Sequence, residues 1–187
     1  IKMKNTLMEL GPLIADFKPP PHPKGICLDG KMVQLVPMEA EEHAEALFEA
    51  NQLDTEGTNW AYLPYGPFAD LKSYHSWVRE NHGLEDPVFL AIVEKESGRP
   101  LGIASYLRIH PAEGSIEVGH IHFSPLLQRT TSATESMFLM MQWAFEAGYR
   151  RYEWKCNALN QASRRAAQRL GFSFEGIFRQ MMIFKGR

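Results

Sequence analysis

The chain has 187 residues, of which 44% are hydrophobic and 22% charged, and its formal net charge is −2. These values are typical of one folded domain, and they exclude a disordered chain, a collagen-like fibre and a disulfide scaffold. The balanced charge argues against a nucleic-acid-binding protein, which usually carries a basic face. No apolar stretch approaches the roughly 20 residues that a membrane span needs, so we expect no membrane partner.

The two cysteines, Cys27 and Cys156, are far apart and lack metal-binding spacing. A zinc cluster is therefore excluded, and a disulfide framework is not expected. His120 and His122 alternate on one predicted strand, but no third ligand lies near them in the sequence, so we expect no metal. The polar, proline-rich start does not resemble a secretory signal. These features predict a reduced, cytoplasmic protein.

The first part of the chain predicts an arm, a strand and two helices. Prolines and glycines in residues 1–30 disfavour a regular helix or a central strand there, so we expect an extended arm over the domain surface. Residues 32–36 alternate like a strand, which a proline then stops. Residues 38–50 are strong helix formers, and residues 70–81 carry apolar side chains at helical spacing behind an N-cap at Asp70.

The rest of the chain alternates strands with helices. Three strands separated by short turns predict an antiparallel meander, over residues 87–93, 101–109 and 115–123. Helices and strands then alternate over residues 132–147, 152–156, 161–170 and 172–184. The first of these helices is apolar nearly all round, which predicts burial against the sheet. The order predicts an α/β fold with a central, mixed and mostly antiparallel sheet and helices on both faces, and residues 31–187 should form a single domain.

The turn between the strand 115–123 and the next helix is rich in small hydroxyl residues. Free backbone N–H groups at a helix N-terminus form an anion site that suits a pyrophosphate. A second interpretation needs no ligand, because Ser132 followed by Glu135 has the spacing of a capping box. From spacing alone, capping is the favoured interpretation.

Resemblance to a known family reverses that preference. Gln128 and Ala133 match the ends of the pattern Gln/Arg-x-x-Gly-x-Gly/Ala, which is the acetyl-CoA loop of the GNAT N-acetyltransferases, although Thr131 stands where the pattern has a glycine. The downstream residues resemble the ribosomal-protein acetyltransferase (RimJ/RimL-like) branch, through Asn160-x-x-Ser163, Gly171-Phe172 and Glu175-Gly176. The resemblance covers residues 31–187 and implies a GNAT-like fold.

This resemblance implies acetyl-CoA as the cosubstrate. The strand before the loop and the strand after the helix would splay apart, and backbone groups of Phe123 and Ser124 would hold the pantetheine. The pyrophosphate would lie in a cradle on the loop, formed by Gln128, Arg129, Thr130, Thr131, Ser132 and Ala133. Asn157 and Asn160 would hydrogen-bond the pantetheine arm, and Asn160 is also suited to cap the helix that follows it.

Acetyl transfer to an amine needs a base that deprotonates the ammonium and an acid that protonates the departing thiolate. Glu117 is the leading base, because it lies where the histone-acetylating branch has its catalytic glutamate; the alternative is an ordinary strand carboxylate. His120 and His122 are further candidates for the base. The tyrosine that many GNAT enzymes use as the acid is replaced here by Ala167, so the resemblance implies Ser163, or water, as the acid.

The acceptor implied is a primary amine, on a protein N-terminus or on a small molecule. The aromatic loop would wall its cleft through Trp60, Tyr62 and Tyr65, unless these rings only pack the loop. A catalytically silent acyl-CoA-binding module is the rival interpretation, motivated by the changed glycine and the missing tyrosine. Relatives of this branch continue past Arg187 with one more strand, so we expect either a longer natural chain or a homodimer that shares strand edges.

Overall fold

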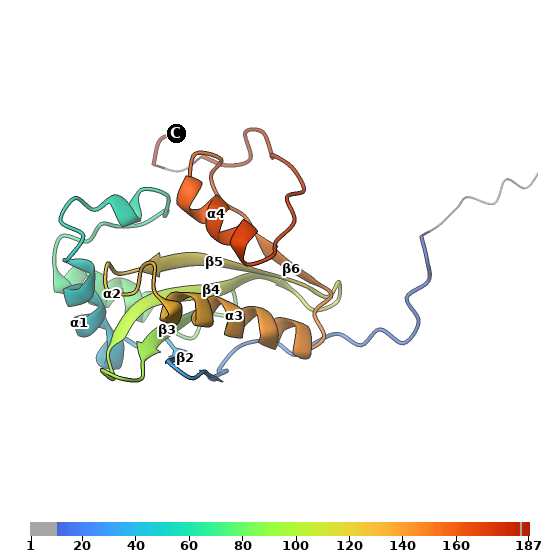
Figure 1. The fold of residues 1–187 in the computed structure, drawn as a ribbon, viewed down its shortest axis with the longest axis horizontal. Helices are drawn as coiled ribbons and strands as arrows, with labels where there is room; N and C mark the ends of the chain where they lie inside the picture. The colour runs from blue at the N-terminus through green and yellow to red at the C-terminus, as the bar shows by residue number, and fades with distance from the viewer. Residues whose placement is uncertain (1–10, 184) are drawn as a thin grey trace, which may run out of the picture.

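The computed structural model describes residues 11–183 and 185–187, and a six-stranded sheet runs through its centre (Figure 1). The strands β1 to β6 lie side by side in chain order, at Leu28–Asp29, Val33–Pro37, Val88–Glu94, Pro100–His110, Ser115–Phe123 and Arg151–Trp154. The helices are α1 (Ala40–Asn51), the short 3-10 helix η1 (Thr58–Trp60), α2 (Leu71–Asn81), α3 (Thr131–Glu146) and α4 (Gln161–Arg169).

Every neighbouring pair of strands is antiparallel except β5 and β6, which are parallel. The predicted meander of β3, β4 and β5 is therefore confirmed, and α3 provides the crossover that the parallel pair needs. The start of α2 is also as predicted, because the side chain of Asp70 accepts a hydrogen bond from the N–H of Ser73 over 2.7 Å. The mixed, mostly antiparallel sheet follows from these pairings.

Two apolar cores lie on opposite faces of the sheet, because successive side chains of a strand point to opposite faces. On β3, Leu90 and Ile92 belong to the core that includes the fully buried Met140 of α3. Phe89 and Ala91 belong to the other core, together with side chains of α1 and α2. Helices cover both faces of the sheet, as the sequence predicts (Figure 1). In the described part of the chain, no helix is long and apolar enough to cross a membrane.

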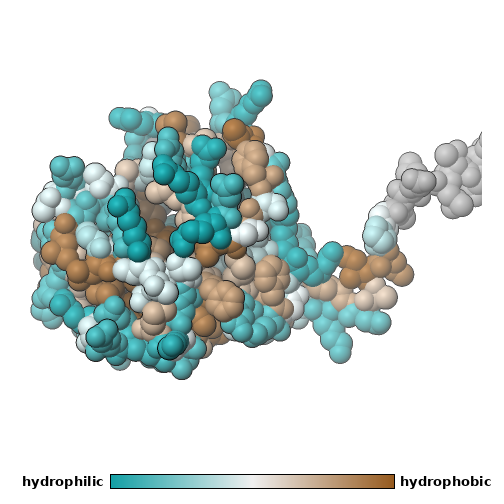
Figure 2. Space-filling model, in the orientation of Figure 1, coloured by the Kyte–Doolittle hydropathy of each residue, from teal (hydrophilic) through white to brown (hydrophobic). Residues whose placement is uncertain are grey.

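The prediction of a last strand over residues 172–184 is wrong for residues 172–183, which form turns and irregular structure. Phe172 is partly buried against the core, but the later apolar side chains are exposed, as in Phe174 at 78%. Figure 2 shows apolar groups that interrupt the polar surface over this segment. A strand forms only where a neighbour completes its hydrogen bonds, and no strand among residues 11–183 pairs with this segment. Phe184 lies outside the described residues.

The structure adds detail to two further predictions. The arm predicted over residues 1–30 has no helix or strand at 11–27, but it ends in β1, which contains no proline and pairs with β2; residues 1–10 lie outside the described part. The hydroxyl of Tyr149 donates to the carbonyl of Pro21 over 3.0 Å and fastens the arm to the domain. The helix α3 packs on the sheet through Met140 and Ala144, as expected, although Phe138 and Phe145 are exposed.

Candidate functional site

A gap opens between β5 and β6. The two strands pair only where Ser115–Val118 lie opposite Arg151–Trp154, and they diverge below α4 (Figure 1). β5 continues to Phe123, and no described strand pairs with its last five residues on that side. The N–H of Ser124 donates to a carbonyl of β4 over 3.0 Å. Because backbone groups alternate between the two sides of a strand, those of Phe123 face the gap, whereas the N–H of Ser124, expected to hold the pantetheine, is used by β4.

A β-bulge lies at the beginning of the gap. The pairing of β4 with β5 shifts between Ile103 and Ser105, and His120 has a φ of 50°. A positive φ is uncommon for a residue with a Cβ, and an extra residue in one strand bends that strand and redirects its side chains. Here the bulge places Nδ1 of His120 3.2 Å from the hydroxyl oxygen of Tyr65.

The loop after β5 presents free N–H groups at the start of α3. Thr130 is the N-cap, and its Oγ1 accepts a hydrogen bond from the N–H of Ala133 over 3.1 Å. The N–H groups of Arg129, Thr131 and Ser132 donate to no acceptor among the described residues. Amides in the first turn have no partner inside a helix, and the helix dipole makes this end positive. The three groups therefore suit a phosphate-bearing ligand.

The capping box predicted from Ser132 and Glu135 is wrong. The N-cap lies two residues earlier, at Thr130, and the carboxylate of Glu135 accepts hydrogen bonds from the N–H groups of residues 31–33 over 2.7–3.0 Å. Burial acts to raise the pKa of Glu135, but these hydrogen bonds outweigh it and lower the pKa below its usual value. Glu135 thus binds α3 to the turn between β1 and β2, which leaves the N-terminal amides of α3 free.

Two polar side chains lie just beyond the end of β5, after the stretch that no described strand pairs with on this side. The amide nitrogen of Gln128 donates to Oδ1 of Asn59 over 2.6 Å and to the carbonyl of Phe123 over 3.1 Å. Ser124 is fully buried, and its Oγ has no hydrogen-bond partner among the described residues. A buried hydroxyl without a partner is costly, so a ligand that completes its hydrogen bond would be stabilised there.

Arg169, at the end of α4, supplies a cation beside the free amides. Its Nη1 donates to Oγ1 of Thr134, in the first turn of α3, over 3.0 Å. A guanidinium presents several N–H donors in a fixed plane that matches the geometry of a phosphate. The two helices are brought together only by the fold, so the sequence does not predict this pairing.

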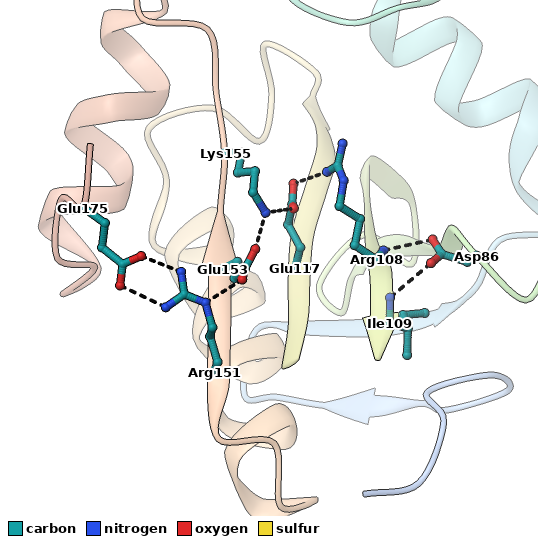
Figure 3. A network of polar contacts seen from close by, with 8 residues as sticks. All are labelled: Asp86, Arg108, Ile109, Glu117, Arg151, Glu153, Lys155 and Glu175. Atoms are coloured by element: carbon teal, nitrogen blue, oxygen red, sulfur yellow. Dashed lines mark hydrogen bonds and ion pairs between the residues drawn. The ribbon is translucent and has the colours of Figure 1, made fainter. Parts of the chain in front are cut away.

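Glu117 is only 3% exposed and lies in a network of charges that crosses from β4 to β6 (Figure 3). Its Oε1 accepts a hydrogen bond from Nη1 of Arg108 over 2.7 Å, and its Oε2 accepts one from Nζ of Lys155 over 2.5 Å. Both oxygens of Glu117 are thus engaged by cationic side chains, next to the last paired residues of β5 and β6.

The network continues from Lys155 toward the edge of the sheet (Figure 3). Lys155 also hydrogen-bonds Glu153, which accepts a second hydrogen bond from Arg151 over 2.5 Å. Burial acts to raise the pKa of Glu153, but Lys155 and Arg151 outweigh it and lower the pKa. Arg151 in turn donates to Glu175 over 2.9 Å. The ammonium of Lys155 is therefore shared by two carboxylates, from β5 and β6.

His120 and His122 are both buried enough to favour the uncharged imidazole. Loss of water contact lowers the pKa of His122 to about 4, and loss of water contact together with the charge of Arg108 lowers the pKa of His120. His122 stacks on Trp60 with ring centroids 3.7 Å apart, and its Nε2 has no partner among the described residues. His120 is only partly buried, so it is the more accessible of the two as a proton acceptor.

The three aromatic residues predicted for the acceptor cleft lie at different depths. Trp60 is 4% exposed and belongs to the core, whereas Tyr62 is 41% exposed. Tyr65 is partly buried and contacts His120, and burial raises the pKa of its hydroxyl well above the usual value. Trp60 is therefore enclosed in the core, whereas Tyr62 and Tyr65 can be reached by solvent.

The polar residues predicted on the other side of the gap follow β6. Oδ1 of Asn160 accepts a hydrogen bond from the N–H of Ser163 over 3.1 Å, which confirms Asn160 as the N-cap of α4. Oγ of Ser163 accepts one from the indole of Trp154 over 2.9 Å, so its own proton is free to be donated elsewhere. Oδ1 of Asn157 accepts one from the N–H of Leu159 over 2.9 Å.

Four polar residues of the site were missed in the sequence: Asn59, Arg108, Lys155 and Arg169. The position of Lys155 could have been inferred, because it follows Glu153 by two positions and, if the extended backbone of β6 continues, its side chain points to the same face. The other three depend on contacts between separate elements. Among residues 11–183 and 185–187, no three His, Cys, Asp or Glu side chains gather as metal ligands would.

Comparison with known proteins agrees with this arrangement. Residues 33–173 match the acetyltransferase (GNAT) domain family. A GCN5-related N-acetyltransferase from Brucella melitensis is 41% identical, with 93% of this chain and 79% of that chain aligned and a TM-score of 0.90. A GNAT-family protein from Chromobacterium violaceum is 38% identical, with 98% and 92% aligned and a TM-score of 0.88.

A more distant similarity concerns the fold alone. The acetyltransferase from Salmonella typhimurium that modifies the N-terminal serine of ribosomal protein L7/L12 is 20% identical, with 86% of this chain and 92% of that chain aligned and a TM-score of 0.71. Among curated proteins, none matches the chain significantly. The gap between β5 and β6, the amides at the start of α3 and the match over residues 33–173 lead to one conclusion: the chain belongs to the GNAT family of N-acetyltransferases.

Proposed function

We propose that the protein transfers the acetyl group of acetyl-CoA to a primary amine, on a protein N-terminus or on a small molecule. The main observation in favour of acetyl-CoA is the presence of three free N–H groups next to the open edge of β5, those of Arg129, Thr131 and Ser132. They are suited to the two phosphates that join adenosine to pantetheine. Membership of the GNAT family, whose enzymes use acetyl-CoA, supports the same cosubstrate.

In this proposal the gap binds the rest of acetyl-CoA. The backbone of Phe123 and the hydroxyl of Ser124 offer hydrogen bonds from β5, and Asn157 lies on the side of β6. An extended pantetheine arm pairs with the open edge much as a strand does. Acetyl-CoA supplies a thioester, and the protein orients it and excludes water around it.

The acceptor ammonium must lose a proton before its nitrogen can attack the thioester. We assign this step to Glu117, a buried side chain that lies beside the opening between β5 and β6 and hydrogen-bonds Arg108 and Lys155, and it acts directly or through a water molecule. His120 is the alternative base, because it is partly buried beside Tyr65 and its lowered pKa favours the neutral ring. His122 is a weaker candidate, since its imidazole is buried against Trp60. Ser163, whose proton is free, is the candidate donor to the departing thiolate.

The rival proposal is a module that binds acyl-CoA without catalysis. Thr131 at the glycine position of the loop and the ion-paired state of Glu117 favour it. Release of free CoA thiol in the presence of amines separates the two proposals, because both predict binding and only the enzyme predicts turnover. A library of amines, including peptides with free N-termini, tests the RimJ/RimL-like acceptor at the same time. Acceptor contacts are assigned to Tyr62 and Tyr65, with Trp60 behind them.

The cosubstrate proposal has a direct structural test. Thr131 is the first residue of α3, where proline is well tolerated, and Thr130 before it has the extended backbone that a following proline requires. Thr131→Pro therefore removes one N–H with little effect on the helix, whereas Thr131→Ala keeps that N–H. By calorimetry, Thr131→Pro should weaken acetyl-CoA binding, and Thr131→Ala should leave it near wild type. Equal affinities of the two variants would contradict the cradle.

The oligomeric state is a further proposal. The exposed apolar side chains of residues 172–183 favour a homodimer that covers them, and light scattering tests this directly.

The proposed compartment is the cytoplasm. Cys27 and Cys156 are both unpaired and exposed, as thiols are in a reducing environment.

A further inference from the structure

The side-chain amine of Lys155 hydrogen-bonds the carboxylate of Glu117, which the proposed function assigns as the base. Lys155 is the first residue after β6, at the point where β5 and β6 begin to separate. Its Nζ is 2.5 Å from Oε2 of Glu117 and also hydrogen-bonds Glu153 (Figure 3). An acceptor ammonium that is about to lose a proton would need a similar carboxylate beside it. The side chain of Lys155 is 26% exposed, so it is not enclosed by the protein.

The direction of the gap decides which end of acetyl-CoA meets this amine. The free amides lie beyond Phe123, at the wide end, and the last paired residues, Val118 and Trp154, mark the narrow end. With its phosphates on the amides and its pantetheine extended along β5, acetyl-CoA directs its acetyl group toward the narrow end. Lys155 lies there. This step rests on the proposed function.

We propose that Lys155 is an acceptor within the chain and that the protein acetylates it from acetyl-CoA. Nζ of Lys155 gives a proton to Glu117, and its lone pair attacks the carbonyl carbon of the thioester. A C–N bond forms, and the nitrogen of the adduct loses its second proton. The C–S bond then breaks, and the departing CoA thiolate takes up that second proton. The products are an Nε-acetylated lysine at position 155 and free CoA, so each chain undergoes the reaction once.

The modification changes the charge balance around the base. An acetylated lysine has no positive charge and cannot form an ion pair. Glu117 then keeps only Arg108 as a cationic partner, and Glu153 keeps only Arg151. The place beside Glu117 that the proposal assigns to the incoming ammonium is then no longer occupied by the charged side chain of Lys155. Acetylation of Lys155 thus alters the site at which external amines are deprotonated.

The test is to incubate the purified protein with acetyl-CoA and to follow acetylation at each lysine by peptide mass spectrometry. Lys95 is the matched reference, because it is also ion-paired, to Asp29, and its side chain is more exposed, at 37%. Chemical acetylation by acetyl-CoA in solution would favour Lys95, whereas the proposal expects Lys155 to be modified faster. Excess CoA should protect Lys155 and leave Lys95 unaffected. Modification of Lys95 ahead of Lys155, or no protection by CoA, would overturn the proposal.

Two variants separate directed transfer from local reactivity. Glu117→Gln should slow acetylation of Lys155 by roughly 10²–10⁴-fold, since it removes the proton acceptor. Lys155→Arg keeps a cation between Glu117 and Glu153, so it should fold, and it should abolish acetylation at this position without affecting Lys95. Calorimetry of acetyl-CoA on the same samples keeps the two proposals distinct. Tight binding without acetylation of Lys155 defeats only this inference, and absence of binding defeats the proposed cosubstrate.

Discussion

The amide nitrogen of Gln128 lies 2.6 Å from Oδ1 of Asn59, so the loop after β5 is hydrogen-bonded to the short helix η1. The same nitrogen donates to the carbonyl of Phe123, at the open edge of β5. One side chain therefore joins the segment assigned to the phosphates, the strand assigned to the pantetheine and the loop assigned to the acceptor. Loss of this contact is expected to loosen all three.

The contact between Gln128 and Asn59 should be measurable as a coupling energy. Each single change, Gln128→Ala or Asn59→Ala, is expected to lower the free energy of unfolding by about 1–3 kcal/mol, because a partly buried partner loses its hydrogen bond. The double variant should lose less than the sum of the two. Denaturant unfolding of the four proteins gives the answer. Strict additivity would mean that the two side chains contribute independently.

The role assigned to Glu117 predicts a specific kinetic defect. Glu117→Gln should lower kcat by roughly 10²–10⁴-fold, because an amide cannot take up the ammonium proton. The affinity for acetyl-CoA should change little, since the phosphates bind at the other end of the gap. Glu153→Gln is the matched control, because it removes the second carboxylate on Lys155 and leaves the base in place. Wild-type turnover of Glu117→Gln between about pH 6 and pH 9 would transfer the role to His120 or His122.

Arg169 should contribute to affinity through charge. Its guanidinium lies beside the first turn of α3, so Arg169→Gln is expected to weaken acetyl-CoA binding about tenfold, as for one hydrogen bond to a charged group. Acetyl-pantetheine, which lacks the phosphates, should bind both proteins equally. Arg165→Gln on the same helix is the control, because Arg165 hydrogen-bonds only Gln161 of α4 among the described residues. Calorimetry at two salt concentrations should show the difference shrinking as salt rises.

The features that the sequence predicts well are those set by neighbouring residues. Asp70 and Asn160 are N-caps, as expected, because a cap depends on a side chain and an N–H three residues later. The strands of the meander are also predicted, since their apolar runs end at turn residues. Local patterns therefore define most of the sheet and its helices.

The features that it predicts poorly depend on distant partners. Glu135 has the spacing of a capping residue, but its carboxylate accepts hydrogen bonds from residues 31–33. The apolar residues 172–183 have the composition of a strand, but a strand also needs a neighbour with free backbone groups. The ion pairs of Glu117 with Arg108 and Lys155 join three separate segments. None of these contacts has a local signature.

The burial of His122 should make the protein less stable in acid. The pKa of His122 is lowered to about 4 in the folded chain, because its ring is stacked on Trp60 away from water, whereas a histidine in an unfolded chain titrates near about 6.5. Between these two values the unfolded chain binds a proton that the folded chain does not. The contribution is therefore fully present above about pH 6.5 and is lost as the pH falls toward about 4, by about 3 kcal/mol at most. Burial also lowers the pKa of His43, on α1, which adds a loss of the same sign.

Denaturant unfolding of wild type, His122→Gln and His43→Gln from about pH 7 down to about pH 4 tests this account. Each variant lacks one titrating group, so its free energy of unfolding should depend less steeply on pH than that of wild type, even where its stability at neutral pH is lower. The larger change in slope is expected for His122→Gln, because its imidazole has no hydrogen-bond partner at Nε2 among the described residues, whereas Nδ1 of His43 accepts a hydrogen bond from the N–H of Glu39 over 2.9 Å. A slope in His122→Gln equal to that of wild type would show that the ring takes up its proton without leaving the folded state.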